Sequence, residues 1–536
     1  MTDTSAHSAV RAAPVPPPAA PSPPPGPSAD PLPRGAPSRP PRLLVIPLLL
    51  AVAGVLWLAH SAYAVCRRVL RRPAAHEQRV ARLGATVRRL AGERAGLLCT
   101  GTGEWRSAVA LRGRSFKSAA RPVEFALDAV LELDTEHRVV RVEPGVTMGR
   151  LVRHLVRRGW TLPVAPGPDG LTVGGLTMGS GVDSTSHRHG PFADTVVAYE
   201  VLLGTGEVVR ASAAEHPDLF HALPWSRGSL GFLVAVELRV VPAHAWVEVR
   251  YHPVTGLVDL CRDLTRLADT ADGPAFVEGF VTGHDEGVVV TGEFADRAKG
   301  QRSRVHRWYA PWFPAHARNC ARAGGRVEYL PLRHYHRRHR RGPFAAGALL
   351  APFGGHPLFR LPLGWATRSG SAFLGPVLTR RIRHHLRRDV VAQEALVPAQ
   401  HLEELVRHCR QVYEIDELWV RPVRLTRGGT PGLVGPGPEV GPGQRQLFMD
   451  VTVVSGVPGP VRRGEPWDPR DATRRFAAWV GGRKGFQAPY GPSESSRDEY
   501  RAMFDCWLYD RVRLAYGAEG VFVDAYDKGV AGRTDA

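Results

Sequence analysis

Cysteine is scarce in this chain, with six residues in 536, at positions 66, 99, 261, 320, 409 and 506. No two of them form a CxxC pair, and their scatter is not that of a disulfide-stabilised scaffold or a zinc ribbon. The sequence therefore predicts a reducing compartment and no metal site.

The two common nucleotide-binding fingerprints are also missing. No GxGxxG lies between a predicted strand and a helix, so a Rossmann site is unsupported. No GxxxxGK[ST] occurs, so a P-loop is unsupported. The formal charge of +19 suits nucleic acid, anionic lipid or a phosphate-rich cofactor equally. Nucleic acid is not predicted as a partner, because no nucleic-acid-binding module is recognisable.

The first 66 residues differ in composition from the rest of the chain. Residues 1–42 are rich in Pro, Ala and Ser, which predicts a disordered, partly polyproline II tail. Residues 43–66 carry no formal charge and are long enough for a transmembrane helix. A secretory signal ending at the "AYA" of residues 62–64 is the alternative, but the 42-residue lead favours an anchor. Six arginines follow within 17 residues and three precede, which predicts a single-pass protein with a cytoplasmic main domain.

A glycine-rich segment interrupts the strand and helix patterns of residues 67–242. Gly174, Gly175, Gly179 and Gly181 fall within eight residues. Glycine lets the backbone approach a ligand closely, and consecutive free N–H groups form an anion nest. Similar small-residue turns occur in "CTGTGEW" (99–105) and "SRGSLGF" (226–232). Three such turns suit an extended, phosphate-containing cofactor, whereas a single one could be a surface loop.

Several stretches resemble a known family. "LPVAPGPDGLTVGGLTMGSG", "HGPFADTVVAYEVLLGTGEVV" and "DLFHALPWSRGSLGFLVAVELRVVP" are similar to the FAD-binding domain of the vanillyl-alcohol-oxidase, or PCMH-type, superfamily. Within it, "HEQRV", "YLPLRHYHRRH", "PFGGHPLFR", "LVPAQHL", "GFQAPY" and "DAYDK" resemble the delta(24)-sterol reductase, or Diminuto, family. The resemblance implies an α+β chain: a two-subdomain PCMH-type FAD-binding domain over 67–242, then an α+β substrate or cap domain over 243–536.

The resemblance also assigns the FAD contacts. They would come from the three turns: Thr100, Gly101, Thr172, Val173, Gly174, Gly175, Leu176, Thr177, Met178, Gly179, Ser180, Gly181, Val182, Asp183, Ser184, Gly228 and Gly231. The first turn has no histidine, so the FAD is expected to be non-covalent. The chain departs from the family pattern at Thr102 and Gly103, where Arg and Pro are usual, and threonine cannot neutralise pyrophosphate charge.

The implied reaction reduces the isolated C24–C25 alkene of a sterol or isoprenoid side chain, with NADPH as donor. An acid must protonate C24, because the positive charge then develops on C25, the more stable tertiary carbon. A hydride would pass from flavin N5 to C25. We consider Tyr490, His187 and Glu200 as candidates for that acid, against core, surface and structural roles respectively. A flavin oxidase of the same superfamily and a membrane-tethered scaffold without enzymatic activity remain the alternatives.

A basic stretch, residues 333–341, lies in the predicted cap domain. Three of its residues are histidines, but five arginines among them make a metal cation unwelcome. NADPH phosphates or lipid headgroups would fit these arginines, and a solvated basic face is the alternative.

Overall fold

The computed structural model describes residues 75–94, 96–102, 116–167, 169–339, 388–428 and 432–530. The predicted tail (1–42) and the predicted transmembrane helix (43–66) lie outside these residues. Within the described ranges, no helix combines the length and the apolar character needed to span a bilayer.

The first half of the described chain is organised around a five-stranded antiparallel sheet. In pairing order its strands are β3 (Val130–Asp134), β4 (Val139–Val142), β8 (Phe232–Arg239), β6 (Val196–Leu202) and β7 (Val208–Ser212). Helix α2 (His76–Gly92) buries Leu83, Val87 and Leu90 in a cluster with Leu202 and Phe232 of this sheet. A separate parallel pair, β1 (Leu98–Thr100) and β2 (Arg121–Val123), precedes the sheet in the chain.

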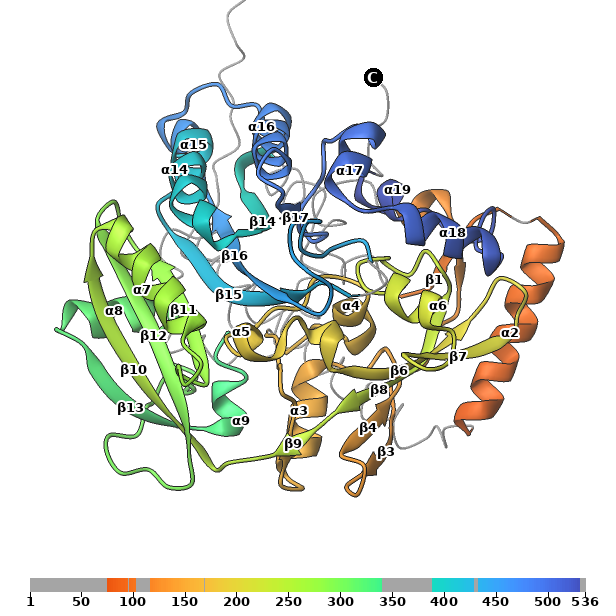
Figure 1. Ribbon diagram of the computed structural model, residues 1–536, viewed down its shortest axis with the longest axis horizontal. Helices are drawn as coiled ribbons and strands as arrows, with labels where there is room; N and C mark the ends of the chain where they lie inside the picture. Colours follow the sequence, from red (N-terminus) through yellow and green to blue (C-terminus); the bar gives the residue numbers. More distant parts are fainter. Residues whose placement is uncertain are drawn as a thin grey trace, which may run out of the picture. The chain divides into compact units, whose positions relative to one another are not determined.

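The second half contains an eight-stranded antiparallel sheet (Figure 1). In pairing order its strands are β13 (Arg326–Pro331), β10 (Trp246–Thr255), β12 (Glu286–Ala295), β11 (Phe276–Val281), β15 (Leu418–Thr426), β16 (Arg445–Gly456), β14 (Val391–Pro398) and β17 (Phe486–Gln487). The predicted α+β class is confirmed by these two sheets and the helices that pack on them.

The two faces of the larger sheet differ in what covers them. Leu418 and Val420 of β15, Met449 and Val451 of β16, and Ala395 of β14 point to one face, because side chains alternate along a strand. Helices α7 (Leu257–Asp269), α14 (Leu402–Tyr413) and α16 (Pro469–Gly481) cover that face. The intervening residues of the same strands point to the opposite face, toward the glycine-rich segment.

The end of the chain returns to the first half. Helices α17 (Arg497–Met503), α18 (Trp507–Ala515) and α19 (Ala525–Val530) lie near α6 (Pro217–Ala222) and β1 in Figure 1. Leu508 and Val512 of α18 share one core with the five-stranded sheet, and the Leu98 amide donates to the Val521 carbonyl at 2.7 Å. The C-terminal segment therefore completes the half of the molecule that carries the glycine-rich turns.

Candidate active site

The glycine-rich segment joins the two halves of the chain. It begins with the short helix α4 (Val173–Thr177), where the Thr172 Oγ1 caps the Gly175 amide at 3.2 Å. Beyond α4, the carbonyls of Ser180, Val182 and Ser184 accept hydrogen bonds from the second half. Their donors are the Tyr490 hydroxyl, the Arg421 Nη1 at 2.8 Å and the Val277 amide at 2.8 Å. The segment is thus fixed against the polar face of the larger sheet.

The glycines of this segment are required for two different reasons. A Cβ on Gly174 would lie 2.7 Å from the Pro144 Cβ, and one on Gly181 would lie 2.7 Å from the Phe192 Cβ. A Cβ on Gly179 would lie 2.6 Å from the Gly175 carbonyl oxygen. These three glycines permit close packing inside the protein. Gly175 is exposed, and its Cβ would meet only the Thr172 Oγ1 at 3.1 Å, so this is the position with space on its outer side.

Several buried polar atoms along the turns have no hydrogen-bond partner among the described residues. They are the Oγ atoms of Ser180 and Ser226, the Thr185 Oγ1 and the Asp183 Oδ2. Buried polar groups in folded proteins are nearly always satisfied, and leaving one unpaired costs about 1–3 kcal/mol. A polar ligand such as FAD could satisfy these four atoms at the glycine-rich turns. The predicted contacts Ser180 and Asp183 are among them.

Basic side chains lie at the first and third turns. The Lys117 ammonium donates to the carbonyls of Thr100 and Thr102 at 2.8 and 2.6 Å. The Lys528 ammonium donates to the carbonyls of Arg227 and Gly228 at 2.8 and 2.9 Å. Burial lowers the pKa of Lys528 to about 7, and burial also lowers the pKa of Arg227. The sequence analysis missed Lys117, Arg227 and Lys528, which place basic groups at these two turns.

The other predicted contacts in these turns have mixed surroundings. The Gly101 amide donates to the Val123 carbonyl at 2.6 Å, and the hydroxyls of Thr100 and Thr102 lie 3.2 Å apart. Gly228 adopts φ 69° and lies against Met178, so the third turn contacts the second. A Cβ on Gly231 would lie 2.6 Å from the Val201 Cγ1. Gly231 therefore serves packing against β6.

One cluster of buried charges on the larger sheet faces the glycine-rich segment. Arg421 of β15 forms an ion pair with Asp450, which lies opposite it on β16. The Arg421 guanidinium also lies 3.3 Å from the carboxyl group of Glu394 on β14. Burial and the nearby charge of Asp450 hold the pKa of Glu394 well above its usual range. Burial also raises the pKa of Asp450, while Arg421 opposes that effect. Burial and Asp450 thus favour the neutral form of Glu394, whereas Arg421 favours the charged form of Asp450.

A second cluster is built around Glu278 of β11. Its carboxylate accepts hydrogen bonds from the Arg338 Nε at 2.8 Å, the His339 Nε2 at 3.1 Å and the Trp419 Nε1 at 2.9 Å. Burial alone would raise the pKa of Glu278, but Arg338 and His339 bring it down to about 2. Arg338 also donates to Asp183 at 3.1 Å, which ties this cluster to the glycine-rich segment.

The basic stretch that begins at Arg333 contributes to these contacts. Arg337 binds the Asp169 carboxylate at 2.8 Å, and His336 bonds to the Thr161 Oγ1 at 3.0 Å. Together with Arg338 and His339, these residues are directed into the protein. In the described part of the stretch, only Arg333 is exposed. Residues 333–339 therefore do not form a solvent-exposed basic surface.

The three predicted acids lie in different surroundings. Tyr490 donates its hydroxyl hydrogen to the Ser180 carbonyl, and burial raises the pKa of that hydroxyl. His187 is 2% exposed, not a surface residue, and its Nε2 bonds to the Pro274 carbonyl at 2.9 Å. Burial lowers the pKa of His187 to about 4, so it is neutral. Glu200 forms a two-point ion pair with Arg141 at 2.7 and 2.9 Å.

Of the three candidates, Tyr490 donates a hydrogen bond to the Ser180 carbonyl in the Thr172–Ser184 segment. Glu394 and Asp450 were missed by the sequence analysis. Each is an acidic residue within an otherwise apolar strand, as in "LFMDVTVV", and that pattern could have drawn attention to them.

Comparison with known proteins agrees with this geometry. The FAD binding domain family matches residues 100–212, which include the first two turns. The fold and the site thus define a flavoprotein with an FAD-binding domain. Over 460 residues the chain is 36% identical to the delta(24)-sterol reductase of Homo sapiens, covering 85% of this chain and 86% of the human protein. The Arabidopsis thaliana delta(24)-sterol reductase is 35% identical over 489 residues, covering 85% of each. The chain belongs to the delta(24)-sterol reductase family.

A more distant relative matches a smaller share of the chain. The L-gulonolactone oxidase of Mus musculus is 32% identical over 125 residues, which is 23% of this chain.

Proposed function

We propose that this chain is an FAD-dependent reductase of the isolated side-chain alkene of a sterol, with NADPH as the electron donor. Family membership supports the reaction class, since both curated sterol reductases align over 85% of the chain. The observation that carries the site is the buried cluster of Glu394, Asp450 and Arg421, which lies on the sheet face against the glycine-rich segment. Residues 67–242 would form the FAD-binding domain and residues 243–536 the cap, with the C-terminal helices returning to the former.

The cofactor would be held by the three glycine-rich turns. Ser180, Asp183, Thr185 and Ser226 offer unpaired polar atoms, and Lys117, Arg227 and Lys528 offer positive charge. Bound FAD would supply a reversible two-electron carrier that accepts and donates a hydride. Among the described residues of the first turn there is no histidine, in keeping with a non-covalent cofactor. Acid precipitation should then release the yellow colour into the supernatant, and colour retained in the pellet would contradict this assignment.

The chain's own acid is assigned to the carboxyl pair on the sheet. An isolated alkene has no carbonyl to stabilise charge, so a proton must be held ready in a dry site. Glu394 holds such a proton because burial and Asp450 disfavour its ionised form. Arg421 balances the remaining charge and fixes the Val182 carbonyl at the same time. Tyr490 would pass the proton or orient the side chain, since it faces the same charges and binds Ser180.

The proposal also includes NADPH as the electron donor and the membrane as the source of the sterol. A membrane-anchored protein with its main domain in the cytoplasm would reach NADPH and draw a sterol from the bilayer. Arg333 is the exposed guanidinium of the described basic stretch, and it is the one available to a 2′-phosphate. A reporter fused after Ala536 should be active in the cytoplasm, and an exported reporter would contradict both the topology and the donor.

A stopped-flow experiment tests the reaction. The purified full chain is reduced by NADPH without oxygen and mixed with desmosterol, a Δ24 sterol, or with cholesterol as the saturated control. Reoxidation of the flavin by desmosterol and not by cholesterol is the expected result. Reoxidation only by oxygen or a quinone would instead support an oxidase, the class named for the mouse relative that matches 23% of the chain.

A further inference from the structure

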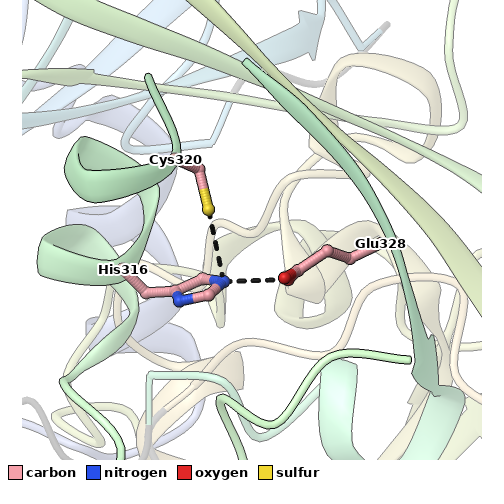
Figure 2. Close-up of side chains that lie close together, drawn as sticks. All are labelled: His316, Cys320 and Glu328. Carbon is pink, nitrogen blue, oxygen red and sulfur yellow. Dashed lines mark hydrogen bonds and ion pairs between the residues drawn. The ribbon is translucent and has the colours of Figure 1, made fainter. Parts of the chain in front are cut away.

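Three side chains that can bind a metal converge at the far edge of the larger sheet, away from the clusters described above. His316 and Cys320 are four residues apart on α8 (Phe313–Arg322), so they lie on one face of that helix. Glu328 projects toward them from β13 (Figure 2). The His316 Nε2 lies 2.8 Å from the Glu328 Oε2 and 3.5 Å from the Cys320 Sγ. The three potential ligand atoms all lie within 4.8 Å of one another.

These separations are close to those of ligands around one zinc ion. Zn–N bonds of about 2.0 Å and Zn–S bonds of about 2.3 Å at tetrahedral angles place N and S about 3.5 Å apart. The His316–Cys320 separation matches that value, and the His316–Glu328 separation needs to open by about 0.5 Å. One atom, Nε2, faces both partners, whereas a relay through an imidazole would use its two nitrogens separately.

The surroundings add a second observation. The Tyr251 side chain is 2% exposed, and its hydroxyl has no hydrogen-bond partner among the described residues. The Tyr251 ring packs edge-on against the His316 ring, with the ring centroids 5.5 Å apart. An unpaired buried hydroxyl beside three convergent ligands fits a donor to a metal-bound water.

We infer that His316, Cys320 and Glu328 form a zinc site, with the fourth position taken by a water molecule that Tyr251 orients. Imidazole, thiolate and carboxylate are ligands that zinc accepts together in tetrahedral geometry. The ion would tie α8 to β13 and so stiffen the outer edge of the sheet. Because the three ligands come from positions 4 and 12 residues apart, no CxxC spacing reveals the site.

The test uses the full chain with its flavin, stripped of metal by a chelator and titrated with Zn²⁺ against a fluorescent zinc indicator. One zinc per chain is expected, with the affinity reduced more than about 100-fold in Cys320→Ser and in His316→Gln, since even outer-shell partners are worth 10- to 100-fold. Cys261→Ser is the matched control. That cysteine is buried on α7 and belongs to a different core cluster, so its loss should leave zinc affinity unchanged.

Cobalt substitution of the unmutated chain gives a result that does not depend on the folding of any variant. Co²⁺ bound by Cys320 should show an intense thiolate-to-cobalt charge-transfer band and the visible bands of tetrahedral coordination. Absence of that band, or equal zinc affinity in the unmutated chain and Cys320→Ser, would overturn the inference. His316 and Glu328 would then form an ion pair that links helix and strand without a metal.

Discussion

The substitution Glu394→Gln should remove the proposed proton donor and leave the other contacts of the site in place. The Glu394 carboxyl is 12% exposed and holds its proton because burial and Asp450 disfavour the charged form. Glutamine has nearly the same shape and the same charge as the protonated acid, and its carbonyl can still accept from the Arg421 Nη2, now at 3.3 Å. The substitution therefore removes a proton donor without creating a cavity or an unpaired charge.

The expected effect follows from these contacts. Loss of a positioned general acid costs about 100- to 10,000-fold in the step that it serves. Reduction of the flavin by NADPH needs no proton from the sheet, so that half-reaction should keep its rate. The contrasting variant is Asp450→Asn, which leaves Arg421 buried without its charged partner. Removing one member of a buried pair costs about 3–5 kcal/mol, so Asp450→Asn should lower stability as well as activity.

Stopped-flow absorbance measures the two half-reactions separately, and thermal unfolding measures stability. The unmutated enzyme should lose its rate with sterol as the pH rises through the elevated pKa of the carboxyl pair, because only the protonated form donates. Glu394→Gln should lack that pH dependence. A Glu394→Gln enzyme that reoxidises with desmosterol at the unmutated rate would refute the assignment of the acid.

The remaining predictions concern cofactor binding and the buried charges. Lys528→Met should weaken FAD binding about 10- to 100-fold, since a hydrogen bond to a charged group is worth about 1.5–3 kcal/mol. Lys484 is exposed, so Lys484→Met should leave FAD binding unchanged. The fluorescence of released FAD measures both affinities. Free Lys528 loses its charge above about pH 7, so the FAD affinity of the unmutated chain should fall as pH rises through that value and should be flat in Lys528→Met. Gly174→Ala should lower the unfolding temperature because its Cβ meets Pro144 at 2.7 Å, whereas Gly175→Ala should change flavin content with little effect on the unfolding of the flavin-free protein. Arg338→Met should cost about 3–5 kcal/mol by removing the guanidinium that pairs with buried Glu278. Arg333→Met should leave stability unchanged and weaken NADPH binding more than NADH binding, as steady-state kinetics will show.

The glycine-rich segment could be predicted from sequence because its chemistry is local. Four glycines within eight residues specify close backbone packing whatever surrounds them, and α4 begins at Thr172 with the cap that its hydroxyl permits. The strands around Val201 and Val209 follow from alternation in the same way. The reason for each glycine could not be predicted, since Gly174, Gly179 and Gly181 contact residues of the protein where a ligand was expected.

The charged residues of the site could not be found locally because their partners are distant in the chain. Lys528 binds Gly228 across 300 residues, and Arg421 binds Val182 across 239. The sequence shows that Arg338 is one of several adjacent basic residues. It does not show that Glu278 of the sheet and Asp183 of the glycine-rich segment are the partners of Arg338. For the same reason His187 was expected at the surface, although α5 (Ser186–His189) packs against β15 and buries it.

Buried charged residues at the junction fall into two kinds: those paired with an opposite charge within the protein, and those without one that a cofactor could pair. Each buried carboxylate at the junction has an arginine: Glu278 and Asp183 share Arg338, and Asp450 with Glu394 shares Arg421. The opposite charges of these clusters are thus paired within the protein alone, before any ligand binds. Arg227 and Lys528 have no carboxylate within ion-pair distance among the described residues, and burial lowers the pKa of both. Burying two like charges beside one turn is unfavourable unless an anion joins them. The pyrophosphate of FAD is an anion of that kind, so cofactor binding should stabilise the third turn more than it stabilises the sheet.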